Sequence, residues 1–104
     1  MSFSITHWTG ATERDPHFDK FDALLDELVT ADAEHGDIAV THESAWSLSI
    51  SRSGAIWLEN VEDGAPVHLG ALSRKDTLAL MRQVAEGRIE EALNAHPWRP
   101  GYPK

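Results

Sequence analysis

Apolar residues recur at three- and four-residue intervals near the start of the chain, a period that matches one face of an α-helix. This pattern predicts an amphipathic helix over residues 16–34. Asp15 and Pro16 suit the N-cap and the first helical position, and Gly36 is expected to stop the helix. The apolar arc of the helix consists of Phe18, Phe21, Leu24, Leu25, Leu28 and Val29.

The middle of the chain is β-rich, and residues 46–51 alternate between apolar and polar, which is typical of a half-buried strand. The predicted strands cover residues 37–42, 46–51, 55–60 and 66–70, with a further short strand over residues 3–8. The turns between the four central strands are short, and short turns join antiparallel neighbours. The pattern therefore predicts an antiparallel meander.

Two helices are expected after the strands. Ser73 and Asp76 match a capping box that opens a helix ending near Gly87, and a shorter helix follows and ends at Pro97. The tail, residues 97–103, is expected to be neither helix nor strand and to pack as a strap, with a proline-rich ligand segment as the alternative.

These elements predict one domain, residues 1–104, of the α+β class. Its antiparallel meander sheet of four to five strands is packed on one side by a long N-terminal helix and a C-terminal helical pair, and the other side stays partly open.

A three-residue hairpin loop at residues 52–54 determines which side chains share a face of this sheet. Ser49 then lies opposite Trp57, and Ser47 lies opposite Glu59, while aliphatic residues pair on the other face. The polar face is thus expected to meet solvent or a partner. Trp57 on that face is either a contact anchor or a residue that the C-terminal tail covers.

A second loop at residues 43–45 places His42 on the core side of the sheet. Val67 and Leu69, the apolar neighbours of His68, are expected to face the core, so His68 should point outward near Glu59. A small-ligand site formed by Ser49, Glu59 and His68 is one alternative that this arrangement leaves open.

The negative charge is segregated along the chain. The net charge is −8, and residues 13–43 hold ten acids against two bases, whereas acids and bases balance from residue 44 onward. Four aspartates, at spacings of 4, 3 and 4, form an acidic stripe along the first predicted helix: Asp15, Asp19, Asp22 and Asp26. Such a stripe is either a docking surface for Lys and Arg of a partner or a solvated face that maintains solubility.

Composition argues against several other functions. The chain has no cysteine, its six histidines lack a two-histidine metal spacing, and no serine lies in a nucleophile elbow, so we expect no metal, no cofactor and no catalytic residue. Acidic charge disfavours nucleic acid, and no apolar stretch approaches the roughly 20 residues that cross a bilayer. No secretory signal is visible, so the expected location is the cytoplasm.

A small, acidic, cysteine-free α+β chain with several tryptophans resembles the immunity proteins and antitoxins of bacterial toxin systems. The resemblance implies a non-catalytic protein that blocks a basic partner protein, through carboxylates that mimic phosphate, and that acts as a monomer or a homodimer. The expected partner-binding residues are Asp15, Asp19, Asp22, Asp26, Glu27 and Trp57, with Glu34 and Asp37 extending the charge.

Two further hypotheses remain open. One is a structural or regulatory homodimer subunit that associates through the open sheet face, and the other is a small-ligand binder or enzyme near Glu59 and His68.

Overall fold

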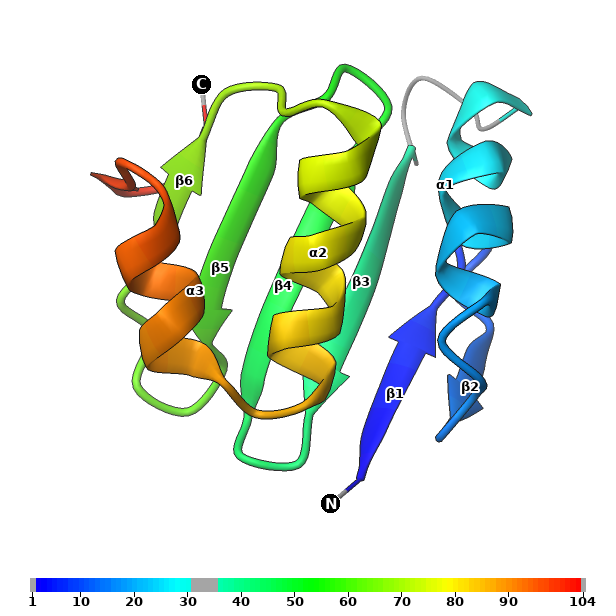
Figure 1. The fold of residues 1–104 in the computed structure, drawn as a ribbon, viewed down its shortest axis with the longest axis horizontal. Helices are drawn as coiled ribbons and strands as arrows, with labels where there is room; N and C mark the ends of the chain where they lie inside the picture. Colours follow the sequence, from blue (N-terminus) through cyan, green and yellow to red (C-terminus); the bar gives the residue numbers. More distant parts are fainter. Residues whose placement is uncertain (1, 31–35, 104) are drawn as a thin grey trace.

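The computed structural model describes residues 2–30 and 36–103 as a seven-stranded antiparallel sheet with three helices on one of its faces (Figure 1). The strand order is β2-β1-β3-β4-β5-β6-β7. The elements in chain order are β1 (Phe3–Thr6), β2 (Thr12–Arg14), α1 (Lys20–Thr30), β3 (Asp37–His42), β4 (Trp46–Ser51), β5 (Ile56–Asn60), β6 (Val67–Leu69), α2 (Arg74–Ala85), α3 (Ile89–Ala95) and β7 (Arg99–Pro100).

The α+β class and the antiparallel sheet are confirmed, but the expected number of strands is too low. Short strands at the two edges, β2 and β7, were not expected. The prediction of a tail without a strand is therefore wrong, because β7 pairs with β6. Pro100 is tolerated there because an edge strand can leave one side of its backbone unpaired. Trp98 does act as a strap residue, since its Nε1 donates to the carbonyl of Ala92 at 2.9 Å.

The predicted register of the central hairpin is confirmed in full. Ser49 lies opposite Trp57 and Ser47 lies opposite Glu59, while Leu and Ile residues pair on the helix-covered face. Gly54 takes φ +92° in the loop, a conformation that glycine adopts without a steric penalty. The serine face is less open than expected, because Ser47 and Ser49 are each only 8% exposed.

The loop at residues 43–45 is also confirmed, and it places His42 on the core side with 7% exposure. The backbone N–H of Ser44 donates to Nδ1 of His42 at 3.1 Å and the Ser44 hydroxyl lies 2.8 Å from the same atom, so the ring is held in place. The other ring edge faces Gly87, where α2 has just ended: a Cβ on Gly87 would lie 2.8 Å from Nε2. His42 thus joins the β3–β4 turn to the α2–α3 turn.

The first helix starts later than its apolar pattern predicts. Residues 16–19 enter α1 through a turn, in which the N–H of Lys20 bonds the carbonyl of His17 at 3.0 Å. Phe18 still packs with the core, because its ring lies 5.7 Å from those of Phe3 and Phe21. The last predicted residues of this helix, 31–34, which include Glu34, lie outside the described residues.

The core fills the space between the helices and the sheet. α1 buries Phe21, Leu24 and Leu28, and α2 lies over β3 and β4 (Figure 1). The start of α2 is confirmed, since the Ser73 hydroxyl accepts from the N–H of Asp76. Within the described residues, no helix has both the length and the apolar character needed to cross a membrane.

Candidate functional site

Asp15 does not belong to the helix that it was expected to cap. Its φ is +49°, and its carboxylate accepts the backbone N–H of Phe3 at 2.9 Å and the hydroxyl of Ser2 at 3.2 Å. The bond from Phe3 holds the pKa of Asp15 below its usual value. The structure therefore gives this aspartate a local role, in which it joins the end of β2 to the start of β1.

Asp19 lies in the turn just before α1, and its side chain is more exposed than those of Asp22 and Asp26. Its carboxylate lies 3.0 Å from Nδ1 of His17, and both side chains are about four-fifths exposed. A contact this exposed contributes little to stability. Asp19 is therefore well placed to meet a partner.

Asp22 and Asp26 lie one turn apart on α1, and both bind Arg74 from the start of α2. Arg74 donates from Nε and Nη2 to Oδ1 of Asp22, at 2.8 and 2.6 Å, and from Nη2 to Oδ1 of Asp26 at 2.9 Å. Nη2 also donates to the backbone carbonyl of Asp22 at 2.8 Å. These contacts raise the pKa of Arg74 above its ordinary value, chiefly through the bond to Asp22.

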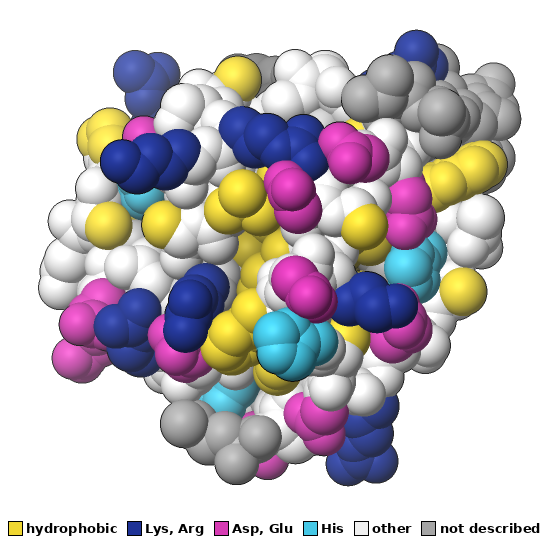
Figure 2. Space-filling model, turned by 45° about the vertical axis from the view of Figure 1, so that its right-hand side comes forward, with side chains coloured by type: hydrophobic (Ala, Val, Ile, Leu, Met, Phe, Trp, Pro, Cys, Tyr) yellow, Lys and Arg dark blue, Asp and Glu magenta, His cyan; other side chains and the backbone are white. Residues whose placement is uncertain are grey.

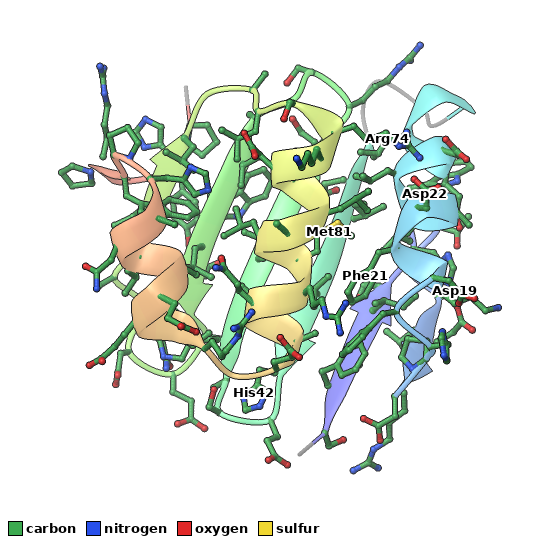
Figure 3. All side chains as sticks on the ribbon, viewed as in Figure 1. Asp19, Phe21, Asp22, His42, Arg74 and Met81 are labelled. Atoms are coloured by element: carbon green, nitrogen blue, oxygen red, sulfur yellow. The ribbon has the colours of Figure 1, made fainter. Side chains whose placement is uncertain are left out.

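The three side chains nevertheless remain accessible. The side-chain exposure is 62% for Asp22, 69% for Asp26 and 47% for Arg74. Figure 3 shows the Arg74 side chain extending from α2 toward Asp22, across the space between the two helices. We call Asp19, Asp22 and Asp26 the acidic face of α1.

Glu27 points to another side of α1, where it holds a histidine. Both of its carboxylate oxygens lie 2.8 Å from Nδ1 of His7, and Nε2 of His7 lies 2.7 Å from Glu13. Lys20 approaches Glu13 at 3.8 Å. The bond to Glu27 is the main reason that the pKa of His7 is raised, despite partial desolvation. Glu27 thus fastens α1 to the end of β1 and is not part of the acidic face.

Trp57 lies half-buried in a row of side chains on the face without helices. The register places it between Ser49 on β4 and His68 on β6. His68 donates from Nδ1 to the carbonyl of Gly101 at 2.9 Å, so the tail packs beside this row. The structure therefore brings together three of the residues predicted for this face.

Glu59 lies on the same face, two residues beyond Trp57 on β5. Its carboxylate accepts a hydrogen bond from the hydroxyl of Tyr102, so the tail reaches β5 as well as β6. No hydrogen bond joins Glu59 to His68 in the described part of the chain.

The arginine that binds the acidic face could not be found from local sequence patterns. Arg74 lies 52 residues from Asp22, and His7 lies 20 residues from Glu27. The aspartate pattern included Asp22 and Asp26, but it did not indicate that an arginine of the same chain binds them. Among residues 2–30 and 36–103, no group of three His, Cys, Asp or Glu side chains could hold a metal ion.

No protein-family model matches this chain, and neither a curated protein sequence nor a solved structure shows significant similarity to it. Its function is therefore inferred from the chemistry of its own surface.

Proposed function

We propose that this chain is a non-catalytic protein-binding module that holds a basic partner protein against the acidic face of α1. The observation that carries the proposal is the manner in which Asp22 and Asp26 hold the guanidinium of Arg74. Two carboxylates and a backbone carbonyl converge on one planar cation, which is the geometry that favours Arg over a simple point charge. The face is thus chemically suited to the arginines of a partner.

The net charge supports the same proposal. Two of the three exposed carboxylates, those of Asp22 and Asp26, share one arginine, so the acidic face stays negative after Arg74 has bound. The whole chain carries −8, which would speed association with a basic protein at low ionic strength. An immunity- or antitoxin-type role, in which the face occupies the basic active site of a toxin, is the form of this proposal that the resemblance suggests.

The test measures, by isothermal titration calorimetry, the binding of a synthetic twelve-residue peptide that consists of Arg and Ser. The wild type should bind this peptide, and raising the salt from about 50 to about 300 mM should weaken binding strongly because the charges are exposed. Replacing Asp19, Asp22 and Asp26 with Asn should remove most of the binding.

The matched control carries the same change in charge at exposed positions elsewhere. Replacing Glu62 and Asp63, in the β5–β6 turn, and Glu90, on α3, with their amides should leave most of the binding intact. Equal losses in both triple variants would show that overall charge, and not the acidic face, attracts the peptide. An absence of binding by the wild type would overturn the proposed function.

The half-buried Trp57 favours one second candidate, a homodimer that associates through the face without helices. Aromatic side chains are enriched at the centres of interfaces. Sedimentation velocity distinguishes this candidate, because Trp57→Ser would shift such a dimer to the monomer mass. A wild type that sediments as a monomer would exclude it.

A further inference from the structure

Two apolar recesses lie between α1 and α2. One, of about 390 Å³, lies toward the β4–β5 loop and has walls that include Leu25, Leu28 and Leu72. The other, of about 350 Å³, is walled by Phe18, Phe21 and Leu78 among others. Figure 2 shows apolar side chains gathered in a recess on this face, with acidic and basic side chains around it.

The ion pair between Arg74 and Asp22 separates the two recesses. Arg74 lines the first recess and Asp22 lines the second, and the two side chains bond each other. Further along the two helices, away from the start of α2, Phe21 and Met81 lie between α1 and α2, each with at most 2% exposure (Figure 3). We call the two recesses, together with the ion pair between them, the groove; its apolar walls include Leu25, Leu72 and Phe21.

We infer that Arg74 is an internal occupant of the partner's arginine site and that the groove takes apolar side chains next to that arginine. The inference rests on the proposed function and specifies the partner: a segment that carries Arg flanked by large apolar residues. Arg74 competes with this segment for Asp22 and Asp26, so it acts as an autoinhibitory latch.

The charge and exposure of the side chains along the groove support a partner segment that carries arginine. The α1 bank of the groove carries Asp19, Asp22 and Asp26, whose carboxylates match a cation. The rest of the groove carries two further arginines: Arg52 lines the first recess from the β4–β5 loop, and Arg82 on α2 lies 4.8 Å from the centre of the Phe18 ring. A cationic ligand is therefore expected to contact α1, with its apolar side chains directed into the groove. Because the latch is an exposed ion pair, its exchange for a partner arginine costs little.

The experiment compares three twelve-residue peptides by calorimetry: Arg with Ser, Arg with Leu, and Lys with Leu. The Arg/Leu peptide should bind the wild type roughly tenfold more tightly than the Arg/Ser peptide, which is the effect of burying about 60 Å² of apolar surface. The Lys/Leu peptide should bind more weakly than the Arg/Leu peptide, because an ammonium cannot reproduce the forked contacts.

Removing the latch should then strengthen binding. Arg74→Gln should raise the affinity for the Arg/Leu peptide about two- to fivefold, the range that an exposed ion pair is worth. Lys75→Gln is the matched control, because it removes the same charge from the neighbouring exposed residue and leaves the latch in place. Circular dichroism and thermal unfolding confirm that both variants are folded.

The outcomes separate the two proposals. Equal binding of the Arg/Leu, Lys/Leu and Arg/Ser peptides, with no gain in Arg74→Gln, would overturn the latch and the groove while leaving the proposed function intact. Equal gains in Arg74→Gln and Lys75→Gln would reduce the latch to a general charge effect. Self-association of Arg74→Gln without peptide would assign the groove to a second copy of the chain and overturn the inference. Binding of no peptide would overturn both proposals.

Discussion

Gly87 offers the sharpest test of how the helices are fixed to the sheet. It follows α2 with φ +77°, and a Cβ at this position would lie 2.8 Å from Nε2 and 2.9 Å from Cε1 of His42. The ring cannot move aside easily, because it is buried and its Nδ1 is bonded to the backbone N–H of Ser44. Gly87→Ala therefore imposes backbone strain and a steric clash at the same site.

The magnitudes of the two effects can be estimated separately. An alanine in the left-handed region costs about 1–2 kcal/mol, and overpacking a filled core site costs about 1–3 kcal/mol more. Gly87→Ala should thus lower the free energy of unfolding by about 2–5 kcal/mol. Gly64→Ala is the matched control, since Gly64 has a similar φ of +69° but a Cβ there would extend into open space, with no such contact within 4 Å. Gly64→Ala should lower the free energy of unfolding only by the backbone contribution, about 1–2 kcal/mol.

Urea denaturation followed by tryptophan fluorescence measures both losses under the same conditions. A double-mutant cycle of Gly87→Ala with His42→Ala should show that the two changes are coupled, because the smaller side chain removes the clash. If Gly87→Ala and Gly64→Ala lower the free energy of unfolding by equal amounts, His42 does not pack against the α2–α3 turn and the reasoning fails.

Three further predictions concern the surface. His7→Gln should lower the free energy of unfolding most at about pH 5.5, because the pKa of His7 is raised in the folded state. The stability that His7 contributes is complete below about pH 6.5 and is lost as the pH rises through the pKa of the folded state. A destabilisation that stays constant up to about pH 9 in urea denaturation would contradict this. Trp57→Ser should cost about 1–2 kcal/mol in the same assay, since the side chain is half-buried, and a loss above about 4 kcal/mol would mean that the tail covers it fully. Replacing Asp22 and Asp26 together with Asn should leave thermal unfolding cooperative with a slightly lower midpoint, because the pair with Arg74 is exposed; loss of the fold would show that the pair is structural.

The central hairpins and the start of α2 could be predicted from sequence because local chemistry determines them. Gly54 and the three-residue loop require one register between β4 and β5, and a shift of one residue would expose every aliphatic side chain. Ser73 supplies the cap that begins α2. In each case the deciding contact joins residues that are close in the sequence.

The errors arose where a distant contact overrides the local pattern. Asp15 matches a helix cap in the sequence, but the N–H of Phe3 binds its carboxylate from a strand twelve residues away. β7 forms because β6 presents an open edge to it, not because Arg99 and Pro100 favour a strand. The same limit applies to the site: the stripe of aspartates is visible in the sequence, but its pairing with Arg74 requires the fold.

The most direct test of the central claim is a chemical-shift titration of ¹⁵N-labelled protein with the Arg/Leu peptide. We predict that the perturbed amides cluster on α1 and the first turn of α2, around Asp22, Asp26 and Arg74, and that high salt reverses the shifts. Perturbations centred on Trp57 and His68, on the opposite face of the sheet, would contradict the claim.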